Sequence, residues 1–168
     1  MKGIIIYKTK YGSTLEFAQM LKENFPFELC EFSNSGFNLD SFDIVILCGS
    51  LHGGKFSLKG YLTDNWNILK RKKVILMITS GAANKEFIMS VMEKNLNSEI
   101  LENVKMFPVG GRYILKRFNF IDRTMIRLVA FLSSDKDVRN GMLEERDNVK
   151  RGNLNEIINY TNRLLLEK

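Results

Sequence analysis

Five short runs of apolar residues, separated mostly by stretches with helical spacing, constrain the fold of this chain most strongly. The runs cover residues 3–7, 27–32, 43–48, 74–79 and 104–110 and are rich in Ile, Leu and Val. A short apolar run without alternation is typical of a strand buried on both faces, as in a parallel sheet. Strands that alternate with helices predict right-handed crossovers and helices on both faces of the sheet. The expected architecture is a doubly wound α/β fold.

The first helix is predicted to follow directly on the first strand and its loop. Apolar residues recur there at helical spacing, Ser13 or Thr14 can cap the helix, and Pro26 marks its end. Residues 58–69 and 84–96 predict two further helices. The segment 33–41 carries Gly and Asn and predicts either a loop or a short helix.

A long connection separates the last predicted strand from the last helix. Residues 111–152 span about 40 positions, where βα loops normally have about 2 to 6, so the insertion is expected to have a function. The final helix is predicted to begin at Asn153, which forms a capping box with Glu156. A chain of 168 residues has the size of one domain, and a single domain over residues 1–168 is expected.

Charge and location restrict the class of partner. The formal net charge is +6, which favours an anionic partner or surface. No nucleic-acid recognition motif accompanies that charge, so nucleic acid is not expected. No apolar run approaches the length of a transmembrane helix and the first run is too short for a signal peptide, which predicts a cytoplasmic protein. The two cysteines, Cys30 and Cys48, lie in apolar runs without metal-ligand spacing and are predicted to be core residues.

The loop at residues 9–14 carries the strongest functional signal. It reads Thr-Lys-Tyr-Gly-Ser-Thr and leads from the first strand into the first helix. Its hydroxyl and backbone N–H groups therefore converge at a helix N-terminus, which is an anion site. The loop has neither the glycines of a dinucleotide fingerprint nor those of a P-loop. Three or four hydrogen bonds of about 1.5 to 3 kcal/mol each would hold a phosphate monoester there.

This loop resembles the S/T-x-T-G-x-T phosphate signature of flavodoxins, with Tyr11 where many members have Thr. The order of elements over nearly the whole chain also matches that family. The resemblance implies a five-stranded sheet of order 2-1-3-4-5 and FMN as cofactor. It implies that FMN is held by Thr9, Lys10, Tyr11, Gly12, Ser13 and Thr14.

Two further loops are expected to flank the flavin ring, as they do in flavodoxins. After the third strand come Ser50, Leu51, His52, Gly53 and Gly54, whose glycines permit close approach of the backbone. His52 either contacts the ring or has a structural or exposed position. After the fourth strand come Ser80, Gly81 and Ala82. That loop lacks the aromatic residue that often stacks on flavin, which implies a more open flavin face, suited to a bulky organic reductant.

The insertion concentrates basic and aromatic residues. Its first part holds five cations against the single acid Asp122, namely Arg112, Lys116, Arg117, Arg123 and Arg127. If residues 118–132 are helical, one face is expected to pack on the domain, and it consists of Phe118, Ile121, Met125, Leu128, Val129 and Leu132. The opposite face mixes arginines with Phe120, Ile126 and Phe131. That face suits an anionic amphiphile, reversible contact with a membrane surface, a dimer contact or a solvated basic surface.

Four motifs in the insertion narrow the resemblance to one branch of the flavodoxin-like proteins. They are Arg112-Tyr113, Asp122-Arg123, Met125-Ile126 and Ser133-Ser134-Asp135. The insertion is similar to that of the flavodoxin-like, menaquinone-dependent protoporphyrinogen IX dehydrogenases, although His52-Gly53 departs from their usual Arg-Tyr. The resemblance implies an enzyme that passes electrons from a porphyrinogen through FMN to a quinone, without a catalytic acid or base. The expected substrate contacts are Arg112, Tyr113, Lys116, Arg117, Arg123 and Arg127.

Two other functions remain consistent with the sequence. One is a flavodoxin-type electron carrier, but such carriers are typically acidic and dock on basic partners, so the charge of this chain has the wrong sign. The other is an FMN-dependent quinone or nitro-compound reductase fed by a nicotinamide, for which the sequence offers no second nucleotide motif.

Overall fold

Five parallel strands form the sheet in the computed structural model, which describes residues 1–33, 37–81 and 84–167. The strands are β1 (Gly3–Tyr7), β2 (Glu28–Glu31), β3 (Ile44–His52), β5 (Lys73–Thr79) and β6 (Val104–Gly110). Their order is β2-β1-β3-β5-β6, and the short β4 (Lys55–Phe56) pairs antiparallel with the end of β3. The predicted doubly wound sheet and its order are confirmed, since these strands correspond to the five apolar runs.

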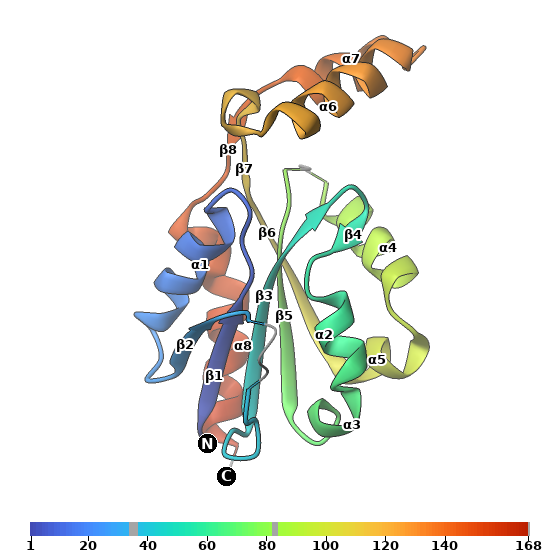
Figure 1. Cartoon of the computed structure of the whole chain (residues 1–168). Coiled ribbons are helices and arrows are strands. Elements are labelled where there is room, and N and C mark those ends of the chain that lie inside the picture. The colour runs from blue at the N-terminus through green and yellow to red at the C-terminus, as the bar shows by residue number, and fades with distance from the viewer. Residues whose placement is uncertain (34–36, 82–83, 168) are drawn as a thin grey trace.

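Helices cover both faces of the sheet (Figure 1). On one face lie α1 (Ser13–Lys22) and α8 (Asn155–Leu166). On the other lie α2 (Lys59–Asp64), α3 (Trp66–Leu69), α4 (Lys85–Asn95) and α5 (Ser98–Asn103). The strands alternate between the two layers: Ile4 and Ile6 belong to the core under α2 to α5, whereas Ile5 belongs to the core under α1 and α8. Both cores are apolar, which explains the continuous apolar runs.

Three helix boundaries differ from prediction, each because of a local hydrogen bond or backbone angle. Gly12, and neither Ser13 nor Thr14, is the N-cap of α1, with φ of 92° and no side-chain cap. The predicted helix 58–69 is broken at Asn65. The side-chain amide of Asn65 donates a hydrogen bond to Tyr61 O and so competes with the backbone N–H groups for that carbonyl.

The last helix also begins later than expected. It starts at Asn155, after the 3-10 turn η2 (Arg151–Leu154). The amide of Asn153 donates to Val109 O at 2.9 Å and to Asn148 O at 2.8 Å, so it ties the chain to β6 and does not cap the helix. In the segment 33–41, the described residues 33 and 37–41 form no helix or strand, as the loop alternative expected. Cys48 is buried as predicted, whereas Cys30 is only partly buried.

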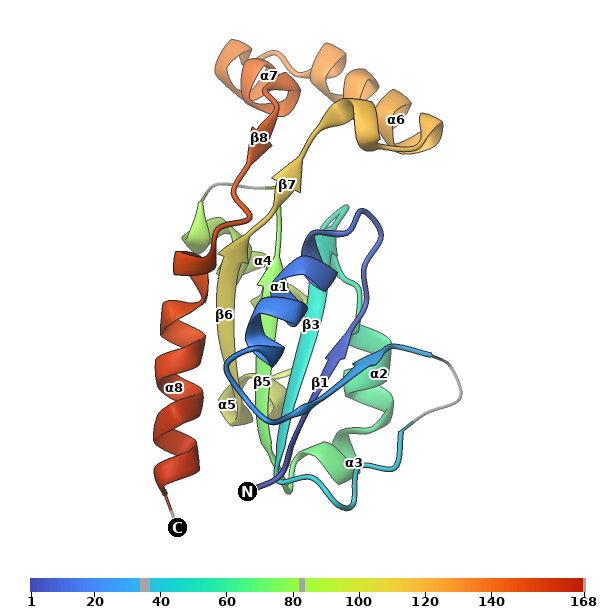
Figure 2. The ribbon, with the colours of Figure 1, turned by 90° about the vertical axis from the view of Figure 1, so that its left-hand side faces the viewer.

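The insertion stands above the carboxyl ends of the strands (Figures 1 and 2). Its elements are β7 (Arg112–Tyr113), the 3-10 turn η1 (Leu115–Arg117), α6 (Phe120–Leu132), α7 (Lys136–Leu143) and β8 (Arg146–Asp147). Strands β7 and β8 pair antiparallel, with Arg112 opposite Asp147, and form a stalk that carries the two helices. No helix in the described part of the chain has both the length and the apolar character to cross a membrane.

The prediction of which α6 face packs on the domain is wrong, although Phe118, which precedes the helix, is buried as expected. The other five residues of that face, Ile121, Met125, Leu128, Val129 and Leu132, are 46% to 71% exposed. The inward side instead carries Asp122, Arg123 and Ile126, which are partly buried, and Ala130, which is buried. Polar contacts of Asp122 with the loops below select this orientation, and apolar periodicity alone contains no signal of them.

Candidate functional site

A cavity of about 520 Å³ lies between the carboxyl ends of the strands and the insertion. This is the edge at which open α/β sheets bind ligands. From the sheet side it is lined by Thr9, Lys10, Tyr11, Ser13, Thr14, Ser50, Leu51, His52, Gly53, Thr79, Ser80, Gly81 and Asn84. From the insertion side it is lined by Gly111, Arg112, Tyr113, Phe118, Ile126, Gly141, Met142 and Arg146. Its volume lies in the range of small-molecule sites.

The loop at residues 9–14 is shaped by its own hydroxyl groups. Thr9 Oγ1 accepts a hydrogen bond from Gly12 N at 2.9 Å, and Ser13 Oγ accepts one from Arg112 N at 3.2 Å. Both bonds use the hydroxyl as acceptor, so each hydroxyl proton can still be donated to an anion. Gly12 adopts φ of 92°, which favours glycine, and a Cβ there would meet no other atom within 4 Å.

Thr14 has a different role from its neighbours in the loop. Its hydroxyl is buried and lies 2.8 Å from Thr79 Oγ1, which in turn donates to Gly49 O at 3.3 Å. These bonds join the start of α1 to β5 and β3. Thr14 lines the cavity as predicted, but its hydroxyl holds the floor of the site together.

The donors present fit the phosphate of FMN. Thr9 and Ser13, whose hydroxyl groups can donate, line the cavity together with Lys10, and α1 begins at Ser13. The first N–H groups of a helix have no partner within the helix, and its dipole favours an anion there. The remaining lining includes Leu51, Tyr113 and Ile126, and apolar and aromatic side chains suit a flat ring system.

The loop after β3 is a hairpin. Strand β3 runs to His52, four residues beyond the predicted end, and Gly53 and Gly54 turn the chain back into β4 with φ of 55° and 74°. Two-residue hairpin turns favour such glycines, and this Gly-Gly signal was present in the sequence. Ser50, Leu51, His52 and Gly53 line the cavity, whereas Gly54 points its carbonyl to the Asn95 amide and does not.

The loop after β5 receives an aromatic wall from the insertion. Ser80 and Gly81 line the cavity, and Ala82 lies outside the described residues. Gly81 is so close to Tyr113 that a Cβ would come within 2.7 Å of its Cδ2. Phe118 packs between Tyr11 and Tyr113, with ring centroids 4.6 Å and 5.2 Å away. The loop itself has no aromatic residue, but Tyr113 and Phe118 of the insertion line the cavity beside it.

Asp122 joins the insertion to both flavin-side loops. Its carboxylate accepts hydrogen bonds from Lys10 Nζ at 2.5 Å and from the Tyr11 hydroxyl, and it lies 3.3 Å from His52 Nε2. Asn119 caps α6 by accepting from Asp122 N at 2.8 Å, which fixes the carboxylate in the first turn. The hydrogen bonds from Lys10 and Tyr11 lower the pKa of Asp122 to about 2. The carboxylate is therefore charged at neutral pH and holds α6 over the site.

Asp122→Asn is expected to lower the free energy of unfolding by about 1 to 2 kcal/mol near neutral pH, because Lys10 and Tyr11 lose a charged acceptor. A carboxyl whose pKa is depressed on folding stabilises the fold above its unfolded pKa, and the contribution is lost as pH falls through the folded pKa. The difference between the wild type and the variant should therefore shrink between about pH 4 and pH 2.

Chemical denaturation at several pH values measures this difference. Asp64→Asn, at an exposed carboxylate of α2, is the matched control and should change the free energy by less than about 0.5 kcal/mol. A destabilisation of Asp122→Asn that is equal at pH 6 and at the acid limit would show that the ionised carboxylate is not what holds α6.

The predicted substrate cations divide into two groups. Arg112 lines the cavity, but its Nε donates to Asp147 at 2.6 Å and its Nη1 to Glu16 at 3.1 Å, so it fastens the stalk to α1. Those carboxylates raise the pKa of Arg112, and the hydrogen bond that Arg112 donates to Asp147 has the largest effect. The cations that do not line the cavity are Lys116, Arg117, Arg123 and Arg127. Tyr113 does line it, and its hydroxyl donates to Met142 O at 2.6 Å.

Arg146 is a cavity residue that the sequence did not single out. Its guanidinium lies 5.9 Å from the Tyr113 ring and donates to Gly141 O, while its buried Nε has no hydrogen-bond partner among the described residues. In the sequence it follows Glu144 and Glu145, so it lies in no basic cluster. Only the pairing of β7 with β8 brings it over the site.

Comparison with known proteins agrees with this architecture. A family model described as a flavodoxin domain matches residues 4–139, which include the whole of α6. The chain belongs to the flavodoxin domain family. Proteins of this family bind FMN, and the predicted cofactor is confirmed at that level. No curated protein gives a significant match.

Two solved structures illustrate the likeness. The Trp repressor binding protein from Bacillus subtilis has a TM-score of 0.51 and 12% sequence identity, over 66% of this chain and 85% of that one. A flavoprotein from Lactobacillus acidophilus in complex with FMN has a TM-score of 0.47 and 15% identity, over 65% of this chain and 91% of that one. At these identities the likeness describes the fold alone.

Proposed function

We propose that this chain is an FMN-dependent oxidoreductase whose insertion forms the substrate wall of the active site. One observation carries the proposal: a single cavity is lined on one side by the flavin loops of the sheet and on the other by Tyr113, Phe118 and Ile126 of the insertion. The aromatic side chains of the insertion stand across the cavity from these loops, which suits a small organic substrate more than a docked protein partner.

The residues of the chain have separable roles in this proposal. The loop at 9–14 holds the phosphate, and the loops at 50–53 and 80–81 flank the ring. FMN supplies the redox chemistry when bound, so the protein contributes binding, orientation and exclusion of water. Tyr113 and Phe118 exclude water, and Asp122 holds them in place through α6 and Tyr11.

We infer a porphyrinogen as the reductant and a quinone as the acceptor. The sequence resemblance of the insertion supports this choice, and so does the mixture of aromatic and basic lining, because an apolar macrocycle with propionates needs both. Arg146 lines the cavity, and its guanidinium can pair with one carboxylate of the substrate. The two unpaired cysteines fit a reducing compartment, so we assign the activity to the cytoplasm.

The test is oxidation of protoporphyrinogen by the purified, FMN-loaded protein with a menaquinone analogue as acceptor. We expect turnover above the rate of free FMN at equal concentration. Absence of turnover, together with strong accumulation of a one-electron flavin state during reductive titration, would identify a carrier. Rapid bleaching of the flavin on mixing with NADH or NADPH would instead identify a nicotinamide-fed reductase. Protein that retains no flavin when purified would exclude all three.

Arg146→Met is expected to raise KM for protoporphyrinogen about tenfold or more, because a charge-assisted hydrogen bond contributes about 1.5 to 3 kcal/mol. FMN affinity and kcat should change little, since the side chain lies on the insertion side of the cavity. Steady-state kinetics and flavin titration measure the two effects separately. Arg127→Met is the matched control, because Arg127 does not line the cavity. A larger KM effect from Arg127→Met would favour the sequence-based prediction that Arg127 contacts the substrate.

A further inference from the structure

The outer face of α6 is apolar and is left largely uncovered by the described residues. It consists of Phe120, Ile121, Met125, Leu128, Phe131 and Leu132, each between 49% and 79% exposed. On a helical wheel these residues share an arc of about 140° that contains one polar residue, Thr124. Seven of the twelve strongly exposed large apolar side chains among the described residues lie on this one helix. Exposed apolar surface concentrated in this way marks an interaction site.

Helix α6 lies at the end of the molecule that is farthest from the chain termini (Figures 1 and 2). The inward side of α6 is occupied by the contacts of Asp122 and by Ile126 in the cavity wall. The helix therefore has two distinct apolar functions: Ile126 contributes to the site, and the outer face points away from it. Nothing in the fold requires the outer face to be apolar, because no described element packs on it.

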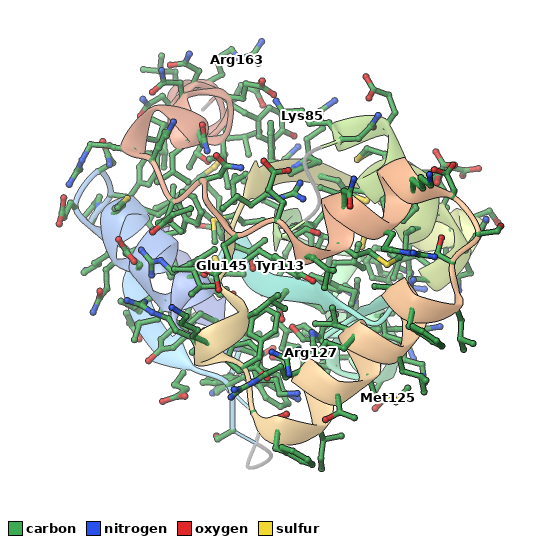
Figure 3. The ribbon with its side chains drawn as sticks, turned by 90° about the horizontal axis from the view of Figure 1, so that it is seen from above. Lys85, Tyr113, Met125, Arg127, Glu145 and Arg163 are labelled. Atoms are coloured by element: carbon green, nitrogen blue, oxygen red, sulfur yellow. The ribbon has the colours of Figure 1, made fainter. Side chains whose placement is uncertain are left out.

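Basic side chains accompany the outer face. Lys116 is exposed just before α6, Arg127 is exposed on its flank, and Lys136 is exposed at the start of α7. Seen from above, Arg127 and Met125 project from opposite sides of α6 (Figure 3). None of Lys116, Arg127 and Lys136 forms an ion pair with a described residue. The apolar arc is thus edged by positive charge that is available to an external anion.

We propose that the outer face of α6 docks on a bilayer that contains anionic lipid. An amphipathic helix with an apolar face and basic edges lies in the interface with its apolar side chains among the lipids and its cations at the headgroups. A second copy of the chain fits less well, because a two-fold contact would place the same basic edge against itself. The proposal concerns the surface alone and does not depend on the substrate inferred above.

Co-sedimentation with lipid vesicles tests the proposal on the full, FMN-loaded chain. The protein is expected to bind vesicles of equal parts phosphatidylcholine and phosphatidylglycerol, to bind phosphatidylcholine alone more weakly, and to be released by high salt. Leu132→Glu should reduce binding to the mixed vesicles about tenfold or more. Leu166→Glu is the matched control, because Leu166 is 81% exposed but lies at the end of α8, at the opposite end of the molecule. This variant should bind vesicles like the wild type.

The visible spectrum of the bound flavin verifies that each variant is folded. Equal binding by Leu132→Glu and the wild type would overturn the proposal. So would a wild type that ignores vesicles but forms a concentration-dependent dimer that Leu132→Glu abolishes, since the outer face would then be an interface between copies. Because the readout is vesicle binding, a protein that binds lipid but fails to oxidise protoporphyrinogen would refute the substrate alone.

Discussion

Replacing residues 114–145 by a short glycine–serine turn is expected to give a chain that binds FMN but oxidises protoporphyrinogen at least about 100-fold more slowly, a loss of about 2.7 kcal/mol of transition-state stabilisation. Arg112 and Asp147 are paired across β7 and β8, so the ends of the excised segment are adjacent and a hairpin turn can join them. The flavin loops all lie on the sheet and remain. The lost part supplies Phe118, Ile126 and Met142, which form the opposite wall of the cavity.

FMN affinity of the shortened chain should fall by no more than about tenfold, because the loop at residues 9–14 loses only the contacts of Tyr11 and Lys10 with Phe118, Asn119 and Asp122. Flavin fluorescence titration measures this affinity, and kcat/KM measures the activity. Phe118→Ser within the intact insertion tests the wall without deleting the helices and should show part of the same loss. Unchanged kcat/KM in the shortened chain would mean that substrate is bound by the sheet loops alone, and the proposed role of the insertion would be refuted.

The sheet and its order could be predicted because buried parallel strands leave a direct mark on the sequence. Runs such as residues 3–7 and 74–79 have to be apolar on both faces, and the structure places alternate members in two separate cores. The loop at residues 9–14 could likewise be predicted as a phosphate site, because Thr9, Gly12 and Ser13 lie within five positions of the chain and need no long-range contact to meet. A local arrangement of this kind can be recognised from the sequence alone.

Apart from Arg112 and Tyr113, which were expected to contact the substrate, the far wall of the site could not be predicted in the same way. Arg146 lies over the cavity only because β7 pairs with β8, and a two-residue strand has no periodicity to detect. The outward orientation of α6 follows from the bonds of Asp122 to Lys10 and Tyr11, which are more than 100 residues away in the chain. Apolar periodicity identifies an amphipathic helix, but it does not say whether the apolar side faces the protein or an external partner.

The phosphate loop yields the largest expected effect on the cofactor. Thr9→Val combined with Ser13→Ala is expected to weaken FMN binding about 100-fold to 10,000-fold, because each hydroxyl can donate a hydrogen bond to the phosphate worth about 1.5 to 3 kcal/mol. Both hydroxyls already accept backbone hydrogen bonds, from Gly12 and Arg112, and retain their protons for the ligand. Isothermal titration calorimetry or flavin fluorescence measures the FMN dissociation constants of the wild type and the double variant.

Riboflavin separates loss of the phosphate contact from damage to the loop, because it carries the ring system without the phosphate. Its affinity should change less than about threefold in the double variant, since the ring is flanked by residues of the other two loops. Thr63→Val combined with Ser90→Ala makes the same chemical change on α2 and α4, where these hydroxyls donate to helix carbonyls, and should leave FMN binding intact. If riboflavin and FMN lose affinity equally, the hydroxyls shape the site but do not bind the phosphate, and the anion must then be held by Lys10 and the N-terminus of α1 alone.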